Sequence, residues 1–363
     1  MIYRFTTALL VIVLLMHYSC RVDDNIAPTP PIVRNWIPVL PVVPLEYINI
    51  SYPDHIQQAV SALDNTPSTN PITNHGATLG RVLFYDKALS KNGEISCSSC
   101  HKAAEGFSDA NAKSEGFEKS LTRRNSMSIL NVRFYKSGKM FWDERANTLE
   151  EQVLLPIQDH IEMGMNLDTL VKHLEEKAYY PELFENAFGS TIITKERIAK
   201  GLAQFIRSLV TYESKYDKVI EGSATFSAQE QQGQTIYNTF GSQQGCVSCH
   251  GGDIIDQHSY NLQLGQRASF VDPFDWNDLG VYENSQIPSD SFKFKVSSMR
   301  NIEMTAPYLH DGSVTNLKDL FNSTHHNFGM NVMEVDALIA FLKTLTDNEI
   351  VQKEKFLDPF VKQ

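Results

Sequence analysis

Four of the five cysteines in the 363-residue chain stand in two copies of one short motif. The copies read Cys-Ser-Ser-Cys-His and Cys-Val-Ser-Cys-His, and their residues are Cys97, Cys100, His101 and Cys246, Cys249, His250. Two thiols on one helical turn can each form a thioether with a haem vinyl group, and the adjoining histidine can then bind the iron. The motifs therefore predict two covalently bound c-type haems.

Other cysteine chemistries explain the two motifs less well. A zinc site would need four ligands drawn from both copies, with each histidine strained beside a cysteine ligand. A thioredoxin-like pair is a second alternative, but a reduced dithiol does not suit an exported chain. A disulfide framework is disfavoured because only Cys20 stands outside the motifs.

Helical patterns dominate the chain, and strand-like alternation is scarce. Apolar residues recur at helical spacing over 190–212, 227–240 and 335–345. Because the haem motif occurs twice, two related units are expected. The predicted fold class is mainly α, with two cytochrome c-like domains that each carry one covalently bound haem.

Haem attachment alone does not reveal a function, because a carrier closes both axial positions of the iron and a catalyst leaves one open. Several further blocks resemble the bacterial di-haem cytochrome c peroxidases over roughly 79–345. The blocks are residues 79–86, 124–126, 141–146, 152, 161–163, 300–302, 305–312 and 341–345. Their common order and compatible spacing make chance similarity improbable.

The resemblance implies an enzyme that reduces hydrogen peroxide to water with two electrons and two protons. The N-terminal haem would be the peroxidatic site, and the C-terminal haem would receive electrons from a small cytochrome c or copper protein. Glu162 matches the family's acid–base group, Gln152 the amide that orients peroxide, and Trp142 the electron route between the haems. Two alternatives are a MauG-like oxidase that acts on a partner protein and a non-catalytic electron-transfer cytochrome.

The resemblance also implies a calcium ion between the two domains. The matching positions are the side chain of Asn125 and the backbone carbonyls of Thr305 and Pro307. Oxygen ligands of this kind suit a hard cation.

Two positions depart from the family pattern. Phe117 stands where many members have a histidine that closes the peroxidatic iron, and no histidine occurs between Lys102 and Trp142. This haem is therefore expected to be five-coordinate at rest, unless Met127 or a lysine serves as ligand. Glu144 stands where the family commonly has glycine.

The distal ligand of the second haem is predicted less directly. The relevant stretch offers His325, His326, Met330 and Met333. His325 lies closest to the expected position, and Met330 is the chemically usual choice because a methionine ligand raises the reduction potential. No tyrosine, the ligand of the methylamine-utilisation branch, occurs between His310 and Phe341.

The N-terminus reads as an export signal over 1–20, with Arg4 followed by an apolar run that ends at Ser19-Cys20. Cys20 is a candidate lipid attachment site, which predicts a periplasmic lipoprotein. A Pro-rich tether over 21–50, a peroxidatic haem domain over 51–215, an electron-transfer haem domain over 216–350 and a tail over 351–363 complete the expected organisation.

The charge of the chain limits its partners. Its formal net charge is −11 and it has no basic patch, so a nucleic-acid partner is not expected. An acidic surface can steer a basic redox protein into contact. A homodimer is an option that the sequence leaves open.

Overall fold

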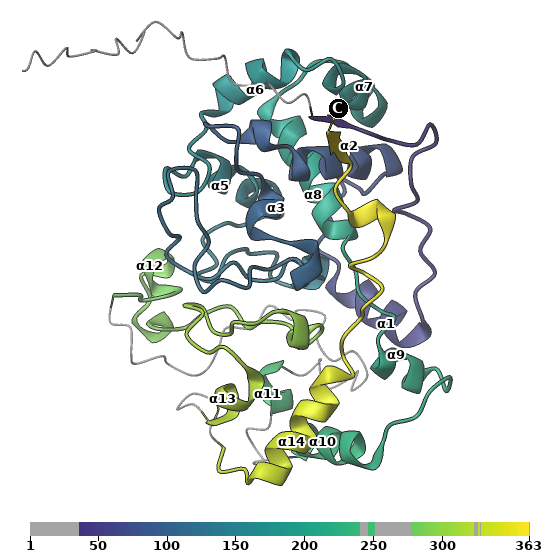
Figure 1. Ribbon diagram of the computed structural model, residues 1–363, viewed down its shortest axis with the longest axis vertical. Helices are drawn as coiled ribbons and strands as arrows, with labels where there is room; N and C mark the ends of the chain where they lie inside the picture. The colour runs from purple at the N-terminus through teal and green to yellow at the C-terminus, as the bar shows by residue number, and fades with distance from the viewer. Residues whose placement is uncertain (1–35, 240–245, 251–276, 323–325, 327, 363) are drawn as a thin grey trace, which may run out of the picture.

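The computed structural model describes residues 36–239, 246–250, 277–322, 326 and 328–362 (Figure 1). In these residues the chain is mainly helical, with one pair of short antiparallel strands, so the predicted fold class is confirmed at that level. The strands are β1 (Trp36–Pro38) and β2 (Phe360–Lys362). The helices of the first half are α1 (Asp54–Leu63), α2 (Asn74–Tyr85), α3 (Cys97–Cys100), α4 (Leu149–Gln152), α5 (Leu154–Gln158), α6 (Leu167–Glu175), α7 (Tyr180–Phe188) and α8 (Lys195–Ser208). Those of the second half are α9 (Lys215–Ile220), α10 (Ala228–Thr239), α11 (Cys246–His250), α12 (Tyr282–Ser285), α13 (Leu317–Asn322) and α14 (Val332–Lys343).

The first hydrophobic core is built around the crossing of α2 and α8. The buried apolar face of α8 comes from the helical spacing of Ile198, Leu202 and Phe205. The two helices approach very closely, because a Cβ atom on Gly80 would lie 2.0 Å from the Gly201 carbonyl oxygen. Glycine at this crossing is therefore a packing requirement.

The second core repeats this plan around α10 and α14. Here Gly233 allows the close approach, since its Cβ atom would lie 1.9 Å from the Ala337 carbonyl oxygen. In each half the first helix of the crossing precedes a short helix with the haem motif, α3 after α2 and α11 after α10. The duplication seen in the motifs thus extends to the helices that support them.

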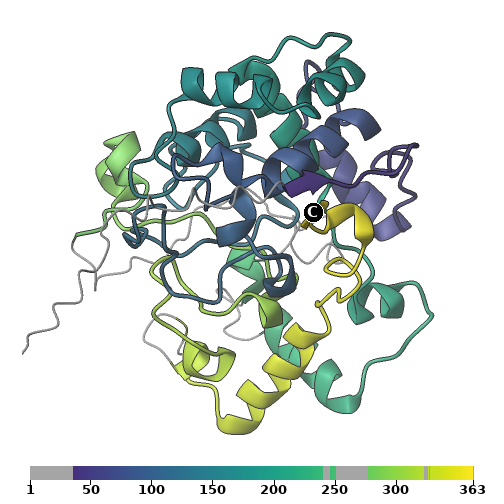
Figure 2. The ribbon, with the colours of Figure 1, turned by 45° about the horizontal axis from the view of Figure 1, so that its top comes forward.

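The C-terminal segment returns from the second core to the first (Figures 1 and 2). Ile350 and Phe356 are buried in the first core, and β2 pairs with β1 in the register Trp36 to Lys362. Tyr47 is also buried, and its hydroxyl donates a hydrogen bond of 2.7 Å to the Lys355 carbonyl.

The predicted Pro-rich tether over 21–50 includes residues that take part in these contacts. Residues 36–38 form β1, and Tyr47 packs against the returning chain. Sequence periodicity missed this contact because it joins segments about 300 residues apart.

Among the described residues, no helix has both the length and the apolar character needed to cross a bilayer. The predicted export signal and Cys20 lie outside the described residues.

Candidate active site

The two motif histidines have the same hydrogen-bonded environment. His101 Nδ1 lies 3.1 Å from the Phe107 carbonyl oxygen, and His250 Nδ1 lies 3.1 Å from the Ser297 carbonyl oxygen. A carbonyl can only accept, so each ring carries its proton on Nδ1 and keeps the lone pair on Nε2. Burial also lowers the pKa of both rings. Each histidine is thus held as a neutral, oriented imidazole, which is the form that binds iron.

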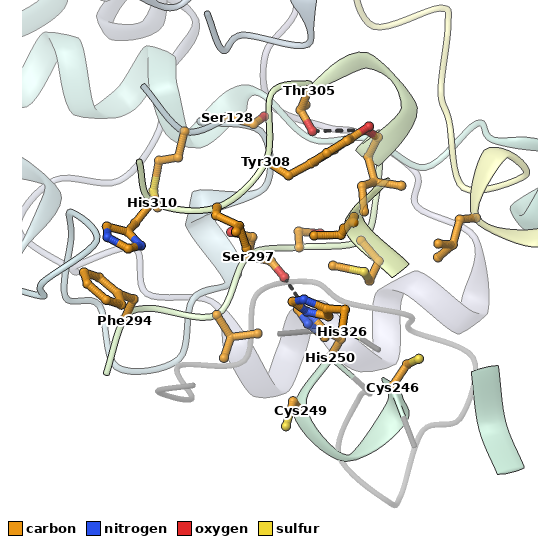
Figure 3. A pocket seen from close by; sticks show the side chains of 18 of the residues that line it. Ser128, Cys246, Cys249, His250, Phe294, Ser297, Thr305, Tyr308, His310 and His326 are labelled. Atoms are coloured by element: carbon orange, nitrogen blue, oxygen red, sulfur yellow. Dashed lines mark hydrogen bonds between the residues drawn. The ribbon is translucent and has the colours of Figure 1, made fainter. Parts of the chain in front are cut away.

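A cavity surrounds the second motif (Figure 3). Its lining includes Cys246, Cys249, His250 and Arg300. Two Arg300 nitrogens donate to Asp217 at 2.9 and 2.8 Å. Its Nε is buried and has no partner within the described parts of the chain. An unpartnered guanidinium donor costs free energy unless a ligand satisfies it, and a haem propionate has the complementary charge. The residues around this cavity therefore fit a haem.

The first motif is accompanied by a carboxylate. The charge of Glu162 raises the pKa of both Cys97 and Cys100, after the larger effect of their burial. Glu162 therefore lies near both thiols of the first motif. Burial, reinforced by Asp159 and opposed by Arg145, raises the pKa of Glu162 from 4.5 to about 7. A carboxyl group with this pKa can both take up and release a proton near neutral pH.

The loop that carries Glu162 is fixed by local hydrogen bonds. Asp159 Oδ1 accepts the backbone N–H groups of Ile161 at 2.7 Å and of Glu162 at 3.4 Å. A second segment then docks on this loop, because the Phe117 N–H donates to the Glu162 carbonyl at 2.9 Å. The neighbouring Gly116 lies so close that a Cβ atom there would be 1.6 Å from the Ile161 carbonyl oxygen.

The Phe117 ring lies on the same loop. A Cβ atom at Gly164 would come within 2.4 Å of this ring, which shows how closely the two segments pack. Phe117 therefore supports the backbone that presents Glu162. Gln152, at the end of α4, is half-buried.

The remaining residues that the sequence singled out lie at the cavity around the second motif. Trp142, Asn125, Thr305 and Pro307 all line the cavity that contains His250. The indole Nε1 of Trp142 donates to the Asn125 carbonyl at 2.9 Å. Asn125 Nδ2 donates to the Asn111 carbonyl at 3.0 Å, so the side-chain oxygen of Asn125 points away from Asn111. Among the described residues, there is no cluster of three or more histidine, cysteine, aspartate or glutamate side chains that could hold a metal ion.

A family model described as di-haem cytochrome c peroxidase matches residues 74–225. The cytochrome c551 peroxidase of Nitrosomonas europaea is 35% identical over 288 residues, which cover 78% of this chain and 83% of the relative. This chain belongs to the di-haem cytochrome c peroxidase family. It is therefore an oxidoreductase of the cytochrome-c peroxidase type, and the family implies haem cofactors.

Two further relatives of this di-haem peroxidase carry MauG-type names. The methylamine utilization protein MauG of Methylophilus methylotrophus is 30% identical, with 77% of this chain and 84% of the relative covered. A solved MauG-like protein associated with microbial copper homeostasis superposes with a TM-score of 0.74 at 30% identity, covering 86% of this chain and 99% of that one.

The surroundings of the second haem position differ from the sequence prediction. His325 lies outside the described residues. Met330 packs against the second core and is absent from the lining of the cavity. His326 does line the cavity, and its ring centroid lies 6.4 Å from that of His250 (Figure 3).

Sequence reasoning also missed the charged residues between the two halves of the peroxidase. Arg124 bridges Asp143, at 2.5 Å, and Asp278, at 2.6 and 2.7 Å. The His310 ring stacks on Phe294 with centroids 3.8 Å apart. Arg124 belongs to a matched block, but its partners are 19 and 154 residues away, so no local pattern could reveal them.

Proposed function

We propose that this peroxidase reduces hydrogen peroxide to water at the N-terminal haem, with electrons that enter at the C-terminal haem from a small redox protein. When bound, the haem iron supplies the site at which peroxide is held and reduced. The observation that carries the proposal is Glu162, a carboxyl group beside both thioether positions with a pKa of about 7. Breaking the O–O bond requires a proton to move from one peroxide oxygen to the other, and Glu162 has the position and the pKa for this transfer.

Gln152 and Trp142 complete the proposed machinery. A side-chain amide donates and accepts hydrogen bonds, so Gln152 can orient peroxide toward Glu162. Trp142 is supported as the electron route by its place in the wall of the second haem cavity and its hydrogen bond to Asn125.

The peroxidatic site is proposed to be open at rest. The position of the closing histidine is taken by Phe117, whose backbone and ring both pack on the Glu162 loop. Met127 is poorly placed to bind this iron in place of a histidine. It lines the cavity around the second motif, and its backbone is hydrogen-bonded to the His101 ring. An electron paramagnetic resonance spectrum of the oxidised protein should contain a high-spin haem, and a wholly low-spin spectrum would contradict an open site.

For the second haem we propose His326 as the distal ligand in place of His325 or Met330. His326 and His250 would hold the haem iron between them, since the separation of their rings leaves room for one metal ion. The observed separation from His250 is 6.4 Å. Two histidines give a lower potential than a histidine and a methionine, so the donor would be a low-potential cytochrome or copper protein.

The calcium ion, the lipid anchor on Cys20 and the periplasmic location remain proposals. Calcium is supported by Asn125, Thr305 and Pro307 lying around one cavity. The export signal supports the location. Whether the protein is a homodimer follows from its mass in solution.

The experiment that tests the function is steady-state peroxide turnover with a reduced small cytochrome. Glu162→Gln keeps the size of the side chain and removes its ability to exchange a proton, so turnover should fall by roughly 10²–10⁴-fold. Glu182→Gln, at an exposed position of α7, is the matched control and should leave turnover unchanged. Equal turnover in the Glu162 variant and the control would remove Glu162 from the mechanism.

A further inference from the structure

Three buried polar side chains meet beside Trp142, and the mechanism above uses none of them. Tyr135 is fully buried, and its hydroxyl donates to Glu144 Oε1 at 2.5 Å. Lys295 is 2% exposed, and its ammonium lies 4.0 Å from the centre of the Tyr135 ring. Buried ionisable groups of this kind are costly unless they compensate one another.

The backbone of Glu144 is strained. Its φ of +56° lies in the left-handed region, and its residue exposure is 6%. A non-glycine residue in this region costs on the order of 1 kcal/mol. A backbone angle of this kind favours glycine, so the carboxylate stands at a position whose conformation suits glycine.

The cluster is connected to the electron route. The Lys295 backbone N–H donates to the Trp142 carbonyl at 2.8 Å. Lys295 and Trp142 both line the cavity around His250. Tyr135 contacts Lys295 directly, so one side chain separates the phenol ring from the second haem cavity.

The arrangement around the ring favours a particular redox chemistry. An electron removed from tyrosine leaves a positive charge on the ring, and an ammonium group at 4.0 Å opposes that charge. The oxidation becomes feasible if the phenolic proton leaves together with the electron. The Glu144 carboxylate stands at the hydroxyl as the acceptor of this proton.

We propose that Tyr135 is a redox-active residue that donates one electron to the haem pair and passes its proton to Glu144. In this step the Tyr135 O–H bond breaks, a new O–H bond forms on Glu144, and a neutral tyrosyl radical remains. The oxidant is hydrogen peroxide, whose reduction to two waters takes one electron already stored in the haem pair, one electron from Tyr135 and two protons from solvent. The next electron from the donor restores the phenol, and the proton returns from Glu144.

This step would let the enzyme complete a two-electron reduction when only one electron is stored. The oxidising equivalent is then stored as the Tyr135 radical in the protein interior until the donor supplies an electron. The inference rests on the proposed function, since peroxide must be reduced for the radical to form.

The test first reduces the holoprotein by one electron per molecule, then mixes it with peroxide in the absence of further donor and records rapid-freeze electron paramagnetic resonance spectra together with peroxide consumption. The wild-type protein should show an organic radical whose signal narrows when the protein is made with ring-deuterated tyrosine. The signal should fall to background in Tyr135→Phe and in Glu144→Gln, whose amide keeps the size of the side chain but cannot take the proton.

Tyr85→Phe is the matched control, because this buried tyrosine donates to the Phe356 carbonyl, which cannot accept a proton. Its radical should equal that of the wild type. A signal that persists in Tyr135→Phe, or one that deuterated tyrosine leaves unchanged, overturns the proposal. Peroxide consumption without any radical also overturns it but leaves the proposed function intact. No consumption in the wild type refutes the proposed function, and the inference falls with it.

Discussion

Replacement of Arg124 by methionine should destabilise the protein in a pH-dependent way. The guanidinium is 8% exposed and joins Asp143 and Asp278, whose side chains are 5% and 3% exposed. Methionine preserves most of the side-chain bulk and removes the charge. Asp143 would keep an ion pair with Arg145 at 3.1 Å. The lost stabilisation is therefore mainly that of the Asp278 carboxylate.

The size of the stability loss follows from the pKa of Asp278. Burial tends to raise this pKa, but the hydrogen bonds and charge of Arg124 outweigh it and lower the pKa from 3.8 to about 2. At about 1.36 kcal/mol per pH unit, this net shift corresponds to about 2.5 kcal/mol at neutral pH. Arg124 makes the largest favourable contribution, and the Gly280 N–H and the charge of Arg123 add to it. Because the folded-state pKa is depressed, this stability is fully present above pH 3.8 and is lost as the pH falls through about 2. Roughly half of it should remain at pH 3.

The assay is urea denaturation of the holoprotein followed by far-ultraviolet circular dichroism at pH 7 and pH 3. Arg124→Met should lower the free energy of unfolding by about 2.5 kcal/mol at pH 7 and by clearly less at pH 3. Arg123→Met is the control, because the neighbouring arginine is 50% exposed. It pairs with Glu283 and, at 3.4 Å, with Asp278, and such exposed pairs contribute less than about 1 kcal/mol. Equal losses in the two variants, or a loss for Arg124→Met that is independent of pH, would refute this reasoning.

Four further outcomes are expected. Gly80→Ala should cost about 1–3 kcal/mol in urea unfolding, more than Gly201→Ala, whose Cβ atom would meet only side-chain atoms of Leu79 and Leu83 at 3.3 to 3.4 Å; similar losses would contradict the close backbone approach. Peroxide turnover should rise with pH through about 7 as Glu162 ionises, and a profile that Glu162→Gln leaves unaltered would speak against that assignment. Removal of calcium by a chelator should lower the melting temperature, with recovery on adding Ca²⁺ but not Mg²⁺; an unchanged melting temperature would argue against the ion. His326→Met should raise the potential of one haem in a redox titration, whereas unchanged potentials and spectra would exclude this ligand.

Local patterns in the sequence were sufficient to predict the helical turns of the two motifs and the main helices. The two Cys-x-x-Cys-His motifs fix which residues share a helical turn, and α3 and α11 have that geometry. The apolar spacing around Ile198 and Leu202 likewise predicted α8, because burial of one helical face depends on residues three and four positions apart.

The position of Glu162 could be predicted only through the family resemblance. Its neighbours in the sequence do not distinguish it from an exposed carboxylate. Its raised pKa depends on burial beside the first haem motif, about 60 residues away.

The tertiary structure alone decided the contacts between distant segments. It placed His326 opposite His250, joined Arg124 to Asp278, and brought Lys295 over the ring of Tyr135. It also paired β1 with β2 in a two-stranded sheet. Each of these contacts pairs residues that share no periodic pattern, so its energy depends on how the two halves pack and cannot be read from either segment by itself.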